Sequence, residues 1–101
     1  MEKITQEEFI IKAKEDNYQI LDVRRPDECA KGIVENAMTI NFMDNDLFLS
    51  EIKKLDKSKP YLIYCRSGNR SGKACTMMDA IGFTNTYNLI GGMLAWEGEL
   101  V

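Results

Sequence analysis

Cys65 lies in a short segment whose composition can activate a thiol. The segment YCRSGNRSGKA, residues 64–74, holds basic, glycine and hydroxyl-bearing residues and no acidic residue. The protein has no histidine, which excludes Cys–His pairs and Ser–His–Asp triads. A free cysteine has a pKa of about 8.5, and helix N-termini or nearby cations lower that pKa to about 3.5–7.5. Any cysteine chemistry must therefore rely on peptide dipoles and arginine charge in place of imidazole.

The loop at residues 66–70 is suited to surround a negatively charged sulfur. Gly68 permits a tight backbone turn, and Asn69 tolerates left-handed geometry. Several N–H groups of such a turn can point inward and form an anion-binding nest. Ser71 is expected to be the N-cap of the next helix, whose positive end points toward the same place. We therefore interpret Cys65 as a nucleophilic thiolate that is stabilised by N–H donors and by the two loop arginines.

The other two cysteines are interpreted as structural. Cys75 shares a helical face with Ala74 and Met78, and Cys29 follows Pro26 on a short helix. An odd number of cysteines without a C-x-x-C motif favours free thiols in a reducing compartment, so a cytoplasmic location is expected. Three dispersed cysteines without histidine make a poor metal site, and neither a metal nor another cofactor is expected.

Length and charge limit the classes of partner. The chain has 101 residues, of which 45% are apolar and 29% are charged, as expected for one domain with its own core. The net charge of −3 argues against a nucleic acid or an anionic membrane as partner. Residues 57–78 nevertheless carry a charge of +5 and no acid, which predicts a site for a small anion. No leader and no apolar run of about 18 residues is present, so neither a signal peptide nor a membrane span is expected.

Helices and strands are predicted to alternate along the chain. Strands are predicted at 18–23, 37–42, 61–65 and 85–89, and helices at 6–15, 44–55 and 71–81, with short helices after Pro26 and after the glycine pair at 91–92. This alternation predicts an α/β fold with a central, mainly parallel sheet and helices on both faces. Ligands of such sheets bind beyond the carboxyl ends of the strands, which is where Cys65 lies.

Four segments, in order, resemble the signatures of the rhodanese homology domain, a family of sulfurtransferases. They are LDVRRPDE at 21–28, KGIVENAMTIN at 31–41, YCRSGNRS at 64–71 and LIGGMLAW at 89–96, so the likeness covers nearly the whole chain. The resemblance implies a single rhodanese-like domain over residues 1–101. The sequence departs from the family pattern outside the cysteine loop, at Cys29, Ile33, Glu35 and Asn36.

The resemblance also implies a reaction, in which Cys65 takes a sulfane sulfur from a donor such as thiosulfate and becomes a persulfide. The persulfide then passes that sulfur to cyanide, to a thiol or to an acceptor protein, without a cofactor. Asp22 and Arg24 are expected to brace the pocket wall through a carboxylate–guanidinium contact, unless they form a plain surface pair. The residues expected to bind the anionic donor are Arg66, Ser67, Gly68, Asn69, Arg70 and Ser71.

Two other functions remain open from the sequence. A cysteine phosphatase or arsenate reductase has a similar loop, but only four residues separate Cys65 from Arg70, one fewer than in the phosphatase signature. A binding module or a persulfide carrier without turnover is the other alternative. The short chain has no second lobe, so we expect Cys65 to be accessible to bulky acceptors. Trp96 either packs in the core or shields the pocket mouth.

Overall fold

Five parallel strands form one sheet in the order β1-β5-β4-β2-β3. The computed structural model describes residues 1–101. The strands are β1 (Glu2–Ile4), β2 (Gln19–Asp22), β3 (Met38–Thr39), β4 (Pro60–Tyr64) and β5 (Asn85–Leu89). The predicted parallel α/β fold is confirmed, with β4 at the centre of the sheet. β1 was not predicted, because a three-residue edge strand with one buried side chain has no recognisable periodicity.

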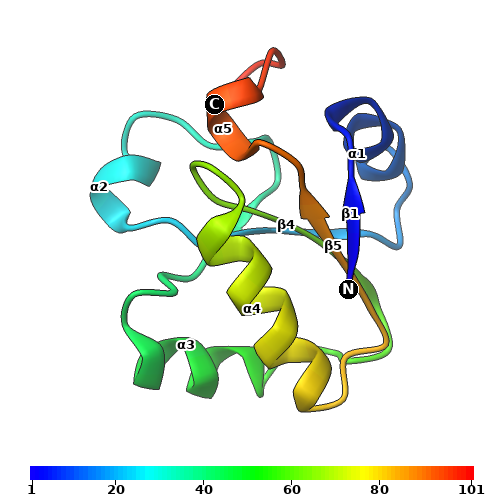
Figure 1. Cartoon of the computed structure of the whole chain (residues 1–101), viewed down its shortest axis with the longest axis vertical. Coiled ribbons are helices and arrows are strands. Elements are labelled where there is room, and N and C mark those ends of the chain that lie inside the picture. Colours follow the sequence, from blue (N-terminus) through cyan, green and yellow to red (C-terminus); the bar gives the residue numbers. More distant parts are fainter.

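Five helices surround the sheet. They are α1 (Gln6–Ala13), α2 (Pro26–Cys29), α3 (Asn45–Ile52), α4 (Asn69–Ala80) and α5 (Gly92–Ala95). Figure 1 shows α3 and α4 in the lower part of the view and α1 and α5 in the upper part, with the strands between them. The helices begin close to the predicted positions but most end earlier, because terminal turns lose their intrahelical partners. None of the helices is long and apolar enough to cross a membrane.

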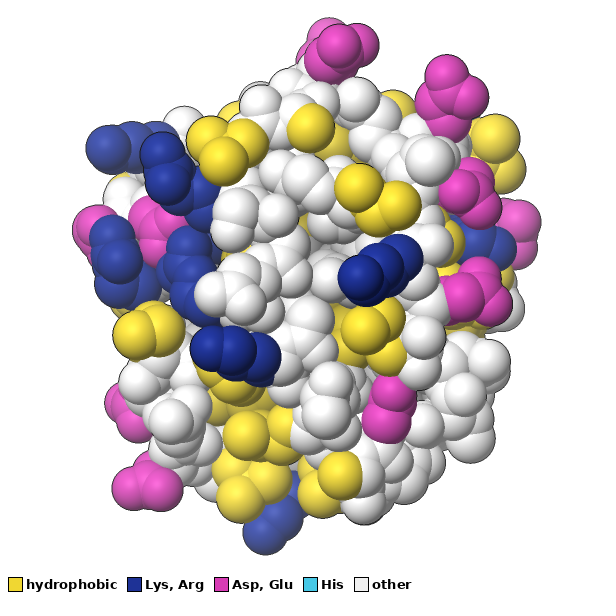
Figure 2. Space-filling view, in the orientation of Figure 1, with side chains coloured by type: hydrophobic (Ala, Val, Ile, Leu, Met, Phe, Trp, Pro, Cys, Tyr) yellow, Lys and Arg dark blue, Asp and Glu magenta, His cyan; other side chains and the backbone are white.

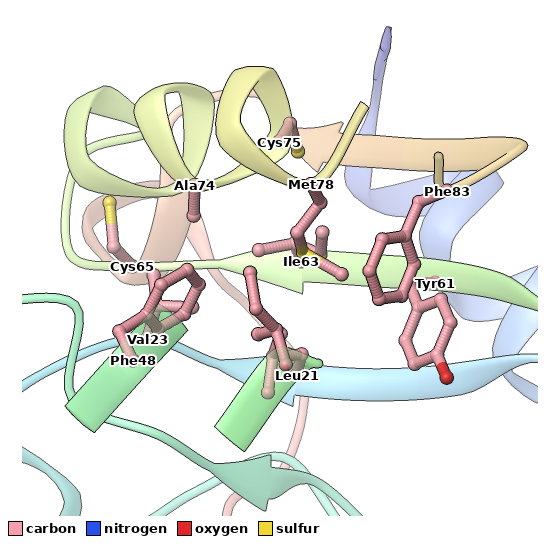
Figure 3. Packing of buried hydrophobic residues seen from close by; sticks show 11 residues of the cluster. Leu21, Val23, Phe48, Tyr61, Ile63, Cys65, Ala74, Cys75, Met78 and Phe83 are labelled. Atoms are coloured by element: carbon pink, nitrogen blue, oxygen red, sulfur yellow. The ribbon is translucent and has the colours of Figure 1, made fainter. Parts of the chain in front are cut away.

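The side chains of β4 alternate between two hydrophobic clusters. Tyr61, Ile63 and the following Cys65 face α3 and α4, where they pack in one cluster with residues of both helices (Figure 3). Leu62 and Tyr64 face the opposite side and pack in a second cluster with α1. Because both faces are covered, β4 reads in the sequence as an uninterrupted apolar run. This burial fixes the position of the strand end from which the cysteine loop departs.

The start of α4 differs from the prediction. Gly68 is the N-cap residue with φ of 102°, so the helix begins at Asn69, two residues before the predicted start. Glycine adopts this left-handed conformation without the steric cost of a Cβ atom, so the chain turns there and not at Asn69. Ser71 is therefore not the N-cap residue but lies inside the first turn of the helix, with its hydroxyl free to contact other groups.

The N-terminus of α5 binds the backbone carbonyl groups of the cysteine loop. The N–H groups of Met93 and Leu94 donate to the carbonyl oxygens of Cys65 and Arg66 at 3.0 and 2.9 Å. Gly92 has φ of 52°, and a Cβ atom there would lie 2.6 Å from the Arg66 carbonyl oxygen. The glycine pair thus permits two backbone segments to approach closely.

Trp96, which follows α5, lies on the other face. Its half-buried ring packs edge-on against Phe9 of the second cluster, with centroids 5.5 Å apart, so Trp96 contacts the core and does not shield the pocket mouth.

A buried ion pair braces the turn after β2. The guanidinium of Arg24 contacts both carboxylate oxygens of Asp22, at 2.8–3.1 Å, and also donates to the Gly32 carbonyl oxygen at 2.7 Å. The side chains of Asp22 and Arg24 are 0% and 8% exposed, so the alternative of a plain surface pair is wrong. The predicted contact is present, and it ties β2 to the segment that follows α2.

We expect Arg24→Met to destabilise the fold by about 3 kcal/mol, because removing one partner leaves the buried Asp22 carboxylate without a countercharge. Arg25→Met is the matched control, since Arg25 pairs with Asp27 on the surface and exposed pairs contribute little. Chemical denaturation of the two variants measures the difference. Equal midpoints would show that the buried pair does not hold the turn.

Candidate active site

The sulfur of Cys65 accepts hydrogen bonds from the loop that follows it. The Gly68 N–H lies 3.1 Å from Sγ, and the Ser71 hydroxyl oxygen lies 3.3 Å away. The N–H groups of Ser67 and Ser71 also face the sulfur. Figure 3 shows the sulfur pointing from the end of β4 toward α4. The inward-facing peptide dipoles expected from the sequence are therefore present around Cys65.

These contacts decide the ionisation of the thiol. Burial raises the pKa of Cys65, but the Ser71 hydroxyl and the N–H groups of Ser71, Gly68 and Ser67 outweigh burial and lower it below the ordinary cysteine value. Cys29 has no such donor and Cys75 has only the Thr86 hydroxyl, so burial dominates and raises their pKa values to about 11 and about 12. Cys65 is thus the cysteine that ionises most readily.

The loop arginines do not hydrogen-bond to the sulfur, although the sequence suggested direct help from them. Arg70 binds both carboxylate oxygens of Glu28 in α2, at 2.7 and 2.9 Å. Arg66 is exposed and points into a surface cavity. Arg70 still acts through space, since the negative charge of Cys65 contributes to raising the Arg70 pKa. The thiolate is therefore stabilised mainly by neutral donors, with arginine charge at longer range.

Glu28 is a site residue that the sequence did not single out. Its carboxylate orients the Arg70 guanidinium, and that contact lowers the pKa of Glu28 to about 2. The acid ends the LDVRRPDE segment, near the start of a short helix, where an acidic side chain is favourable whether or not it binds a cation. The pairing joins positions 42 residues apart, which no local pattern reveals.

Asn88 is the second residue that sequence reasoning missed. Its Nδ2 donates to the Gly68 carbonyl oxygen at 3.1 Å, and its Oδ1 accepts from the Ser71 hydroxyl at 2.6 Å. Asparagine is disfavoured in strands, so Asn88 inside the strand predicted at 85–89 was an available signal. Asn88 connects β5 to both sides of the turn around the sulfur.

Cys65 has no exposed surface, so the expectation that it is accessible to bulky acceptors is wrong. The sulfur is enclosed because the Gly68 turn brings Ser71 over it, while Val23 and Phe48 pack in the same cluster (Figure 3). The loop itself therefore seals the sulfur. Reaction at Sγ therefore requires the loop to open.

A basic cavity of about 700 Å³ lies outside the sealed loop, between α2 and α5. Two acidic side chains, Asp27 and Glu28, line it together with five basic ones: Arg24, Arg25, Lys31, Arg66 and Arg70. Figure 2 shows the dark blue side chains gathered on the left of the molecule, with magenta ones among them. The cavity is electropositive on a protein of net charge −3, which suits an anionic ligand. Asn69 also lines the cavity. No cluster of His, Cys, Asp or Glu side chains in the structure is arranged to hold a metal ion.

Comparisons with known proteins place this geometry in a family. The family model described as "Rhodanese-like domain" matches residues 5–99. The Bacillus subtilis protein named "Putative sulfurtransferase YtwF" is 43% identical over 89 residues, covering 88% of this chain and 82% of that protein. The crystal structure of a rhodanese-like domain protein from Staphylococcus aureus has a TM-score of 0.87 at 34% identity, covering 100% of this chain and 97% of that chain.

A third relative shows the same domain in a larger protein. The tRNA uridine(34) hydroxylase of Pelagibacter ubique is 33% identical over 91 residues, which cover 79% of this chain but only 30% of the hydroxylase.

The departure from the family pattern at Asn36 has a local explanation. Asn36 is the only non-glycine residue with positive φ, at 67°, and asparagine tolerates the backbone conformation that glycine would adopt.

We expect Cys65 to be alkylated at lower pH than Cys29, although Cys29 is more exposed. Only the thiolate reacts, and the Cys65 pKa is lowered while that of Cys29 is about 11. Iodoacetamide labelling across a pH series, located by peptide mass spectrometry, measures the order. The Cys65→Ser variant identifies the first-labelled site. Labelling of Cys29 at the lower pH would contradict the assignment.

Ser71→Ala is expected to raise the Cys65 pKa by about one unit, which corresponds to the loss of one hydrogen bond to a charged group. Ser67→Ala is the matched control, because Ser67 faces the sulfur with its backbone N–H and its side chain is exposed. Ultraviolet titration of the thiolate compares the two variants. Equal pKa values in both would show that the Ser71 hydroxyl does not stabilise the thiolate.

Proposed function

Because the chain belongs to the rhodanese-like domain family, we propose that it transfers sulfane sulfur from thiosulfate through a persulfide on Cys65. The observation that carries the proposal is a thiol with a lowered pKa inside a ring of N–H and O–H donors. Sulfurtransferase-named relatives support sulfur transfer at the level of the family. We propose in addition that the protein acts in the cytoplasm.

The first half-reaction is a displacement at sulfur. The Cys65 thiolate attacks the outer sulfur of thiosulfate, and a new S–S bond forms. The S–S bond of thiosulfate breaks, and sulfite leaves with its electron pair. One negative charge remains on the outer sulfur of the persulfide, so atoms and charge balance without a redox partner. The donors at Gly68 and Ser71 keep the attacking sulfur ionised before this step.

The second half-reaction returns the enzyme to its starting state. An acceptor thiolate or cyanide attacks the outer sulfur, and the Cys65 thiolate leaves with the electron pair of the broken S–S bond. Stabilisation of that thiolate by the loop makes it a good leaving group as well as a nucleophile. The same donors thus serve both halves, which predicts ping-pong kinetics.

The basic cavity supports an anionic donor. Arg66 and Lys31 line it and form no ion pair with an acidic side chain, so their charge is available to thiosulfate. Arg70 is already held by Glu28 and contributes to the field as part of that pair. Asp22 and Arg24 would act indirectly, by fixing the wall between β2 and α2.

The burial of Cys65 supports a second candidate, a persulfide carrier that serves one protein partner. In that case contact with the partner, and not a small donor alone, would open the loop. The hydroxylase relative is an example of this domain as part of a larger protein. Turnover with small substrates separates the carrier from the enzyme.

The test is incubation with thiosulfate followed by intact-protein mass spectrometry. The parent is expected to gain the mass of one sulfur atom, whereas Cys65→Ser gains none and Cys75→Ser gains as much as the parent. Subsequent cyanide should remove the added mass and release thiocyanate in repeated cycles. Absence of labelling by thiosulfate alone would favour the carrier, whose loop opens only on contact with its partner, and equal labelling of the parent and Cys65→Ser would refute Cys65 as the sulfur acceptor.

A further inference from the structure

The hydroxyl of Ser71 has two acceptors within reach and one proton to donate. Asn88 Oδ1 lies 2.6 Å from the Ser71 Oγ, and Cys65 Sγ lies 3.3 Å from it on the other side. A hydroxyl is a single donor, so it cannot serve both at once. Ser71, Asn88 and Cys65 are all buried, so bulk water does not replace the bond that is lost.

The orientation of the Asn88 carboxamide is fixed by a neighbour. Its Nδ2 donates to the Gly68 carbonyl oxygen, which also accepts the Gly72 N–H at 3.0 Å. A flipped carboxamide would place two oxygen atoms against each other at Gly68. The group that faces Ser71 is therefore an acceptor, and it competes with the sulfur for the hydroxyl proton.

We propose that Asn88 and Cys65 compete for the hydroxyl proton of Ser71, and that this competition sets how readily the sulfur ionises. In the thiol state the S–H donates to Ser71 Oγ and the hydroxyl donates to Asn88. In the thiolate state the hydroxyl turns to Sγ, and Asn88 Oδ1 loses its donor. Asn88 is thus a positioning residue that opposes ionisation through Ser71, while it holds the Gly68 turn in place.

The competition has a consequence for sulfur transfer, which rests on the proposed function. When the persulfide forms, the negative charge moves from Sγ to the outer sulfur. The Ser71 hydroxyl is then free to return to Asn88, so the bond that was lost in the thiolate state is restored. Asn88 therefore favours the sulfur-loaded state over the free thiolate.

The other charged and titratable groups near Cys65 do not hydrogen-bond to Ser71 or Asn88, so they are common to all the variants below. They lie on three elements that pack around the loop: Arg70 and Cys75 on α4, Glu28 on α2, and the Asp22–Arg24 pair after β2.

A double-mutant cycle tests the competition. Asn88→Ala is made in the parent and in Ser71→Ala, and the Cys65 pKa is titrated in all four proteins. Loosening of the Gly68 turn contributes equally in both backgrounds. Removing Asn88 frees the Ser71 hydroxyl for the sulfur, so Asn88→Ala should lower the Cys65 pKa in the parent relative to its effect in Ser71→Ala. We expect the difference between the two backgrounds to be about half a unit to one unit. Equal changes in the two backgrounds would overturn the proposal.

Asn88→Asp should shift the Cys65 pKa in the opposite direction from Asn88→Ala. The carboxylate is a stronger acceptor, so it should hold the Ser71 proton more firmly and raise the Cys65 pKa more with Ser71 than without it. It lacks the Nδ2 donor to the Gly68 carbonyl oxygen, but that loss and the added charge are present in both backgrounds. Asn85→Ala is the matched control on the same strand, because Asn85 is exposed and far from the loop; it should leave the pKa unchanged. Coupling of the same sign for both Asn88 variants would also refute the competition.

The parent supplies a measurement that needs no Asn88 variant. The ¹³C resonance of the Asn88 carboxamide should move at the Cys65 pKa in the parent and stay constant in Ser71→Ala. A resonance that moves equally in both would overturn the proposal, even where the Asn88 variants do not fold. All of these titrations are independent of sulfur donors, so failure of thiosulfate labelling would count against the proposed function and not against the competition.

Discussion

The site stabilises a negative charge on a buried sulfur without an imidazole to share the proton. Burial opposes that charge, and the hydrogen bonds from Gly68 and Ser71 oppose burial. The rest of the site exists to hold those donors in place. The left-handed Gly68 aims its own N–H, the early start of α4 brings Ser71 over the sulfur, and the N-terminus of α5 pins the carbonyl groups of the loop.

Neutral donors contact the sulfur directly, whereas the two loop arginines lie at the basic cavity outside it. An arginine in contact with Sγ would stabilise the thiolate, but it would also make the sulfur a poorer nucleophile and occupy the space of the substrate. Arg70 is instead held by Glu28 at the edge of the cavity, and Arg66 projects into it. The arrangement places close stabilisation on backbone and hydroxyl dipoles, and leaves the charge of Arg66 free to attract an anion.

Sealing of Cys65 links the chemistry to motion of the loop. The donors stabilise the thiolate more effectively because water is excluded, since their dipoles act in a medium of low dielectric. For the proposed reaction at Sγ, the loop at residues 66–70 would have to open from this closed state. The buried Asp22–Arg24 pair and the β4 core provide a rigid frame against which such a loop can move.

The sequence alone determined the alternation of helices and strands, the parallel α/β class and the identity of Cys65 as the reactive thiol candidate. Those features depend on local spacing and on residue type, which a single chain displays directly. The tertiary structure alone decided that Arg70 binds Glu28, that Ser71 lies inside the helix, that Asn88 completes the site and that Cys65 is sealed. Each of these depends on which distant segments meet, or on one backbone dihedral angle at Gly68, and neither is encoded in a local pattern.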